Sequence, residues 1–303
     1  MRAILFPGQG AQSVGMGAAL CERHPAARAV FEEADDVLGY SLSTLCFEGP
    51  ADQLIRTDRA QPAIYVTSVA TVQALEESGG LDRDGYGAAA GLSLGEYTAC
   101  WFADVFSFAD GLRVVQRRGT AMQEACDLEP SGMVSLIGAD RDKAEAVCDA
   151  ARGDGVLVVA NLNSPGQVVL SGSHGACGRA QEAAKELGIR RAIPLKVSGA
   201  FHSPLMATAR ASLEATLSDA DIRDARVPVY SNVTATPTRA GDEIRSLLAR
   251  QVVSPVLWES SMRQLVADGM SSAAEPPPGT VLAGLMKKIA PHVAVDALDN
   301  EEE

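Results

Sequence analysis

Ser93 lies between two glycines in the segment GLSLG at 91–95, directly after the small-residue run YGAAA at 86–90. The G-x-S-x-G pattern is typical of a nucleophilic serine on a sharp strand-to-helix turn, because the glycines remove collisions that such a turn would create. The N–H groups at the start of the following helix, including that of Leu94, could stabilise an oxyanion. A glycine-rich loop that merely contains a serine is the alternative. The predicted strand before it and helix after it favour the nucleophile.

A nucleophilic serine requires a base, which is most often a histidine. The chain has four. His24 lies on a charged helix, His174 begins a predicted helix, and His292 lies in the C-terminal region. His202, in VSGAFHSPLM, follows a predicted strand at a junction with a loop. It is the best candidate for the base once the other three histidines are set aside. The spacing of the acidic residues identifies none of them as the third member of a catalytic triad. A carbonyl or an amide side chain could orient the base instead.

Two further segments could complete such a site. The loop PGQGAQ at 7–12 allows close backbone approach, and we expect the N–H of Gln9 to be a second oxyanion donor. This loop has neither the G-x-G-x-x-G spacing of a dinucleotide site nor the GK[ST] ending of a P-loop. Arg118, in LRVVQRRGTAMQ, would bind a substrate carboxylate through two hydrogen bonds if it faced the site. The alternative for Arg118 is a surface position on a helix, which is the default for Arg117.

Composition limits the classes of function. The 303 residues are 47% hydrophobic and 21% charged, as in ordinary globular proteins. The net charge of −13 argues against nucleic acid as the main partner, and the apolar runs are too short to span a membrane. Six scattered cysteines indicate reduced thiols, and the lack of a Cys/His cluster argues against a metal. We therefore expect a cytoplasmic protein without metal, nucleic acid or membrane partners.

An acidic partner would have to dock on a local basic patch, because the overall charge would repel it. Solvated helix faces are the alternative explanation for most of the basic residues. The candidates for such a patch are Arg113, Arg117, Arg118, Arg190, Arg191, Arg245, Arg250, Lys287 and Lys288.

The predicted elements indicate two domains. Residues 131–197 follow the order β-α-β-β-α-β of a ferredoxin-like module, inserted between 1–130 and 198–303 of a larger α/β domain. In the larger domain, a helix is expected from the residue after Pro62, with this proline in its first turn. The segment SSAAEPPPGT at 271–280 is expected to be a loop, because its prolines forbid a helix.

These segments together resemble the malonyl-CoA:acyl-carrier-protein transacylase family, of fatty-acid synthases and trans-acting polyketide synthase acyltransferases. The resemblance covers nearly the whole chain. It rests on FPGQGAQ at 6–12, QPA at 61–63, GLSLGEY at 91–97, RRGTAMQEA at 117–125, NLNSPGQVVLSG at 161–172, GAFHSPLM at 199–206 and RQVVSPVLW at 250–258. It implies an α/β-hydrolase-like large domain with an inserted ferredoxin-like small domain, and an active site in the cleft between them.

The resemblance also implies roles for residues of the catalytic centre. Ser93 would be the nucleophile and His202 the base. The N–H groups of Gln9 and Leu94 would form the oxyanion hole. The backbone carbonyl of Gln251 would orient the histidine, in place of an acid.

The resemblance also implies residues that bind the substrate, and Gln251 is one of them. Arg118 would bind the malonyl carboxylate, and Asn163 would lie on the small-domain side of the cleft. Phe201 resembles the malonyl-selective form of its position, because a bulky ring leaves little room for an α-methyl group.

The implied reaction is ping-pong transfer of an acyl group. Ser93 would take a malonyl group from coenzyme A and pass it to the phosphopantetheine thiol of an acyl carrier protein. The coenzyme A thioester is then a substrate, no cofactor is bound, and we expect a monomer. Since burying a guanidinium against an uncharged acyl chain would leave it unpaired, Arg118 favours a dicarboxylic acyl group.

Two departures from the family favour polyketide over fatty-acid synthesis. Leu92 replaces the histidine of the usual GHSLGE segment, and residues 271–280 lack a Gly-Pro-Gly turn. Similar GLSLGE segments occur in relatives that hydrolyse acyl groups or transfer other ones. The alternatives are therefore a trans-acting acyl hydrolase, a transferase of a larger acyl group between carrier proteins, and an inactive module that docks carrier proteins.

Overall fold

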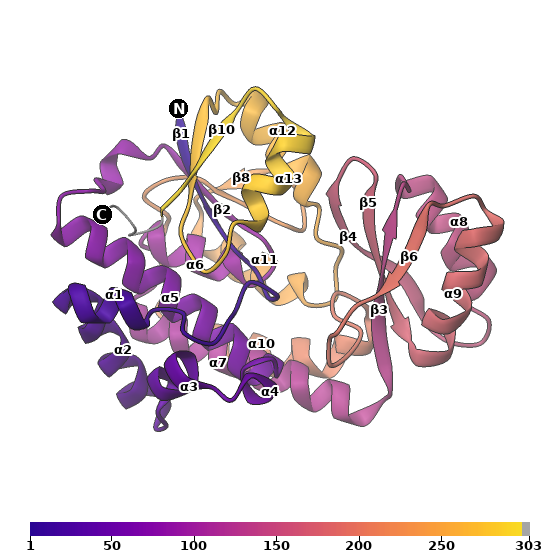
Figure 1. Ribbon diagram of the computed structural model, residues 1–303, viewed down its shortest axis with the longest axis horizontal. Coiled ribbons are helices and arrows are strands. Elements are labelled where there is room, and N and C mark those ends of the chain that lie inside the picture. Colours follow the sequence, from indigo (N-terminus) through magenta and orange to yellow (C-terminus); the bar gives the residue numbers. More distant parts are fainter. Residues whose placement is uncertain (299–303) are drawn as a thin grey trace.

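The computed structural model describes residues 1–298, which form a larger and a smaller lobe (Figure 1). The larger lobe contains a six-stranded sheet with the order β10-β9-β1-β2-β7-β8. Its strands are parallel except for the pair β7–β8. The strands are β1 (Arg2–Phe6), β2 (Ala88–Gly91), β7 (Val229–Tyr230), β8 (Pro237–Thr238), β9 (Ser272–Glu275) and β10 (Ala294–Ala297).

Helices cover both faces of this sheet, as a parallel sheet requires. Ile4 and Phe6 of β1 belong to the core on one face, whereas Ala3 and Leu5 face the other core. The second core is closed by α12 (Trp258–Ala267) and α13 (Val281–Ile289). The first is closed by α2 (Pro25–Leu38), α5 (Thr57–Glu77), α6 (Gly95–Phe102), α7 (Phe108–Leu128), α10 (Ala207–Asp219) and α11 (Gly241–Gln251). The short helices are α1 (Ala18–Arg23), α3 (Leu42–Glu48) and α4 (Ala51–Leu54).

The smaller lobe has the predicted βαββαβ order. Its elements are β3 (Ser131–Ile137), α8 (Arg141–Ala151), β4 (Leu157–Ser164), β5 (Gln167–Ser173), α9 (His174–Glu186) and β6 (Arg191–Pro194). The strands form an antiparallel sheet with the order β4-β5-β3-β6. Helices α8 and α9 cover one face, and Met133 and Val169 on the other face join the core of the larger lobe. The domain boundaries at 130/131 and 197/198 stay a prediction.

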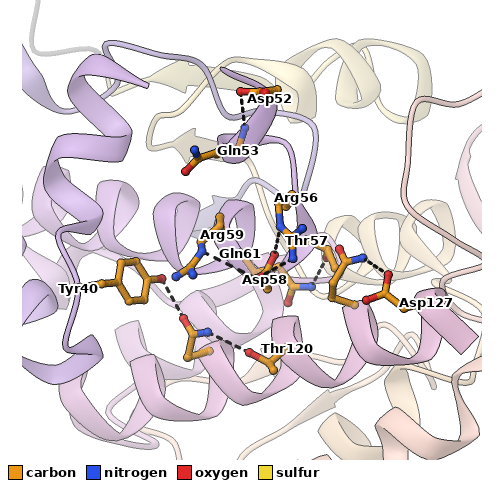
Figure 2. Close-up of polar contacts among 12 residues, drawn as sticks. Tyr40, Asp52, Gln53, Arg56, Thr57, Asp58, Arg59, Gln61, Thr120 and Asp127 are labelled. Atoms are coloured by element: carbon orange, nitrogen blue, oxygen red, sulfur yellow. Dashed lines mark hydrogen bonds and ion pairs between the residues drawn. The ribbon is translucent and has the colours of Figure 1, made fainter. Parts of the chain in front are cut away.

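The structure corrects the predicted start of one helix. Helix α5 begins at Thr57, so Pro62 lies inside it and not in its first turn. Asp58 lies in that first turn, where a carboxylate favours helix formation, and it pairs with Arg56 and Arg59 (Figure 2). Pro62 removes one hydrogen bond within the helix, and the burial of α5 from Ala60 onward stabilises the helix in spite of this loss.

A second correction concerns the segment at 271–280, which is not entirely a loop. Ser272–Glu275 forms β9, a strand between β1 and β10. Its alanines fit between neighbouring strands although they are weak strand formers, because pairing on both sides outweighs their propensity. Among residues 1–298, no helix combines the length and the apolar character needed to cross a membrane.

Candidate active site

Ser93 lies on a tight turn between β2 and α6 with a φ of 52°, a conformation that is rare for residues other than glycine. The flanking glycines are required by contacts between backbones. A Cβ on Gly91 would lie 1.9 Å from the carbonyl carbon of Gly95, and one on Gly95 would lie 2.1 Å from the carbonyl oxygen of Phe6. The sequence thus holds a serine in a strained turn at the carboxyl edge of the sheet.

The glycine-rich loop after β1 packs directly against this turn. A Cβ on Gly8 would lie 2.4 Å from the carbonyl oxygen of Leu92, so the approach requires a glycine. Within the described residues, the backbone N–H groups of Gln9 and Leu94 donate no hydrogen bond to the protein. The side chain of Gln9 is held in place because its Oε1 accepts a hydrogen bond from Thr57 at 2.8 Å. Two donors therefore remain for a charge that develops next to Ser93.

His202 reaches Ser93 from the segment that follows the smaller lobe. Its Nε2 lies 2.7 Å from Ser93 Oγ, and its Nδ1 lies 2.9 Å from the carbonyl oxygen of Gln251, the last residue of α11. Because a carbonyl oxygen only accepts hydrogen bonds, Nδ1 carries the proton and Nε2 can accept the serine proton. His202 is 4% exposed and also has a positive φ of 58°. This arrangement suits a general base without an acidic partner.

Arg118 of α7 is buried beside the serine, with only 2% exposure. Its guanidinium donates to Ser93 Oγ at 3.0 Å, to Gln251 Oε1 at 2.9 Å and to Gln61 Oε1 at 2.6 Å, and it lies over the ring of Tyr97. Arg118 Nε is buried without a hydrogen-bond partner among residues 1–298, and no carboxylate oxygen described there lies within 4.0 Å of the guanidinium. The hydrogen-bond partners of the guanidinium are therefore all neutral, and the Glu96 carboxyl acts on its charge only from a greater distance.

A comparison with family models identifies the family of the chain. The model described as "Acyl transferase domain" matches residues 4–295, nearly the whole chain. The chain belongs to this family of acyltransferases. Ser93, His202 and Arg118 all lie within the matched range.

Two curated relatives resemble the acyltransferase over nearly all of its length. It is 44% identical to "Malonyl CoA-acyl carrier protein transacylase" of Bacillus subtilis (strain 168), over 99% of this chain and 94% of that protein. It is 40% identical to "Polyketide biosynthesis protein ThaF" of Burkholderia thailandensis, over 97% of this chain but only 24% of that longer protein. The predicted membership of the malonyl-CoA:acyl-carrier-protein transacylase family is confirmed.

Solved structures confirm the predicted fold class. The acyltransferase superimposes on an acyl-carrier-protein-S-malonyltransferase from Bartonella henselae with a TM-score of 0.95 and 38% identity, covering 99% of this chain and 96% of that one. A structure described as a "type II PKS acyl-carrier protein in complex with its malonyl-transacylase" gives a TM-score of 0.93 and 37% identity, covering 97% and 94%.

A cavity of about 440 Å³ lies between the two lobes of the acyltransferase and opens onto the serine. The larger lobe contributes the predicted residues Gln9, Leu92, Ser93, Arg118, Phe201 and His202. The smaller lobe contributes Met133, Asn161, Asn163, Val169 and, from the strand end, 195–197. The side-chain oxygen of Asn163 is buried without a hydrogen-bond partner in the described part of the chain. All the predicted substrate-side residues except Gln251, which lies behind Arg118, thus line one cavity.

Three buried residues of the acyltransferase were missed by the sequence analysis. Asn232 accepts the N–H of Ser93 at 2.7 Å and donates to the carbonyl of Gly91 at 2.8 Å, which fixes the turn. Glu96 lies behind Gln251, and Gln61 holds Arg118. Glu96 belongs to the segment GLSLGEY and Gln61 to the segment QPA. A polar residue inside either segment was therefore the signal that could have indicated them.

The pKa of His202 predicts an unusual pH profile. Burial, with a smaller contribution from the Arg118 guanidinium, lowers this pKa from 6.5 to about 4. Since the base acts only when neutral, the rate of acyl-enzyme formation should stay level from about pH 8 to about pH 5.5 and fall by half only near pH 4. Rapid-quench mass spectrometry across this range would test it, with circular dichroism at each pH as the control. A midpoint near the ordinary histidine value would contradict it.

Proposed function

We propose that this acyltransferase moves a malonyl group from coenzyme A, through an ester on Ser93, to the phosphopantetheine thiol of an acyl carrier protein. The observation that carries the proposal is the buried guanidinium of Arg118, which has neutral hydrogen-bond partners only. A buried guanidinium without a direct ion pair is costly, and a substrate carboxylate would reduce that cost. Arg118 lies 3.0 Å from Ser93 Oγ, so the carboxylate must be close to the reacting carbonyl. In a malonyl group a single methylene separates the two.

The reaction follows from the hydrogen bonds around the serine. In the first half, Ser93 Oγ attacks the thioester carbonyl while its proton passes to His202 Nε2, and the N–H groups of Gln9 and Leu94 stabilise the oxyanion. The intermediate collapses, the carbon–sulfur bond breaks, and the coenzyme A thiolate takes the proton from His202. In the second half, His202 removes the proton from the pantetheine thiol of the carrier protein, and the sulfur attacks the ester carbonyl. The bond between Ser93 Oγ and the acyl carbon then breaks, the new thioester leaves, and the proton passes from His202 back to Ser93 Oγ.

The other walls of the cavity support the two halves of this reaction. Coenzyme A and the carrier protein share the pantetheine arm, whose amide N–H groups could donate to the unpaired oxygen of Asn163. Phe201, which is 6% exposed, lines the same cavity as Ser93, and its bulky ring favours malonyl over methylmalonyl. All these residues come from one chain, which is consistent with a monomeric enzyme.

A local basic surface supports an acidic carrier protein as the acceptor. Three exposed basic residues lie at the edge strand β6: Arg190 directly before it, Arg191 at its start and Lys196 just after it. Lys196 also lines the cavity. These side chains could attract an acidic carrier in spite of the net charge of −13. A relative of known structure, described above, is likewise bound to a carrier protein.

A further part of the proposal concerns the pathway that the enzyme serves, polyketide or fatty-acid synthesis. Leu92 and the segment at 271–280 favour polyketide synthesis on sequence grounds, and Leu92 lines the cavity. The name of the Burkholderia thailandensis relative refers to polyketide biosynthesis, whereas the name of the Bacillus subtilis transacylase states no pathway. We propose a polyketide carrier as the preferred acceptor, which parallel assays with one carrier protein from each pathway would test.

Transfer rather than hydrolysis can be tested by the fate of the acyl-enzyme. The protein is loaded with malonyl-CoA, freed of coenzyme A, and incubated with holo carrier protein, with apo carrier protein or with buffer alone. We expect the malonyl group to move to the holo carrier, whereas the adduct persists with the apo carrier and in buffer. Equal loss of the adduct under all three conditions would identify an acyl hydrolase instead.

A further inference from the structure

Glu96 is a buried carboxyl group that the proposed reaction does not use. It lies on the first turn of α6, three residues after the nucleophile, and is 2% exposed. Among the ion pairs of residues 1–298 it has no cationic partner. A buried carboxyl without an ion pair is costly. Burial raises the pKa of Glu96 from 4.5 to about 7, although its hydrogen bonds and the more distant Arg118 guanidinium oppose this rise. Packing alone would be served as well by an apolar residue.

The hydrogen bonds of Glu96 lead to two residues of the site. Its Oε2 accepts from Gln251 Nε2 at 2.6 Å and from the backbone N–H of Asn232 at 3.1 Å. Gln251 Nε2 also donates to the carbonyl oxygen of Ser93 at 2.9 Å. One carboxyl oxygen therefore connects the end of α11 with the residue that fixes the serine turn.

Gln251 performs two separate functions through two oxygens. Its backbone oxygen orients His202, and its side-chain oxygen accepts from Arg118 at 2.9 Å. A glutamine amide can rotate by half a turn and exchange its oxygen for its nitrogen. Since Glu96 Oε2 accepts hydrogen bonds, it requires the nitrogen on its own side and so keeps the oxygen facing Arg118.

We propose that Glu96 is a positioning residue that fixes the Gln251 amide, and that this contact holds Arg118 in place for a carboxylate-bearing acyl group. This inference rests on the proposed role of Arg118. Position 96 requires a side-chain oxygen that accepts hydrogen bonds. The amide oxygen of a glutamine could accept the same two hydrogen bonds, from Gln251 and from the N–H of Asn232. The negative charge is not required. Acyl groups without a carboxylate need Ser93 and His202 but not Arg118, so the ratio of malonyl to acetyl acylation reports on Glu96.

The test compares acylation by malonyl-CoA and acetyl-CoA in variants of the full chain. Glu96→Leu should lower the malonyl-to-acetyl ratio of kcat/KM by about tenfold, because the Gln251 amide loses its shortest hydrogen bond, keeps mainly the one to the Ser93 carbonyl, and holds Arg118 less firmly. Glu96→Gln should restore most of the ratio. Gln251→Met removes the amide but keeps the backbone oxygen, and should lower the ratio to a similar extent.

Glu275→Leu is the matched control for the loss of a buried carboxyl. Glu275 is 1% exposed, and its oxygens accept from the backbone N–H groups of Leu282 and Ala283, at the start of α13. We expect this variant to lose stability but to keep the wild-type ratio. In the Gln251→Met background, Glu96→Leu should change the ratio no further, because Glu96 acts through Gln251.

The outcomes separate this inference from the proposed function. If malonyl-CoA and acetyl-CoA acylate the wild-type protein equally well, Arg118 does not bind a substrate carboxylate, and the inference about Glu96 fails as well. A wild-type preference for malonyl that survives Glu96→Leu overturns the inference alone. If Glu96→Leu does not fold, an unchanged ratio in Gln251→Met has the same meaning.

Discussion

The Ser93→Ala variant should form no acyl-enzyme, and its rate of malonyl transfer should fall by roughly a thousandfold or more. Without Oγ there is no atom to carry the acyl group between the two thiols. The fold should be retained, because the Ser93 N–H bonded to Asn232 and the flanking glycines are unchanged. Intact-mass measurement after exposure to malonyl-CoA reads out the effect directly.

Ser78→Ala is a suitable control for this variant. Ser78 is exposed at the end of α5 and should be replaceable with no loss of adduct. Circular dichroism would establish that both variants are folded. A malonyl adduct that still forms on the folded Ser93→Ala protein would exclude the serine mechanism.

The second large effect is expected at Arg118. Arg118→Ala should slow acylation from malonyl-CoA by about a hundredfold, while acylation from acetyl-CoA should slow by no more than about tenfold. The carboxylate of malonyl loses its cation, whereas acetyl has no group to bind there. Arg118 also lowers the pKa of His202, but that contribution affects both donors equally and cancels in the ratio.

Arg117→Ala separates this effect from a general loss of positive charge on α7. Arg117 is adjacent in sequence but pairs with Glu124 and Ser212 on the outside of the helix. Pre-steady-state rates with both donors should be close to wild type in this variant. Equal losses for malonyl and acetyl in Arg118→Ala would refute the assignment of the carboxylate site.

The sequence predicted those parts of the site that short segments encode. The turn at Ser93 requires glycines at fixed spacing, and the contacts at Gly91 and Gly95 explain that requirement. The βαββαβ order of the smaller lobe followed from alternating apolar patterns and turn residues. Because these features depend on neighbours along the chain, they can be read without knowledge of tertiary contacts.

Other parts depended on contacts between distant segments. Glu96 meets Gln251 across 155 positions and Asn232 across 136, so no local pattern could indicate the connection. The strand β9 was missed for a similar reason, since alanines form a strand there only because partners lie on both sides. The early start of α5 was not predicted because Pro62 indicated a first turn, whereas the residues before it are held by contacts with distant segments, such as that of Gln61 with Arg118.

The most direct test of malonyl transfer through Ser93 is a competition between acyl donors. The protein is exposed briefly to an equimolar mixture of malonyl-, methylmalonyl- and acetyl-CoA, and its intact mass is recorded before and after proteolysis. We expect malonyl to be the predominant adduct and to map to the peptide that contains Ser93. Predominance of acetyl or methylmalonyl, or an adduct on another peptide, would contradict it.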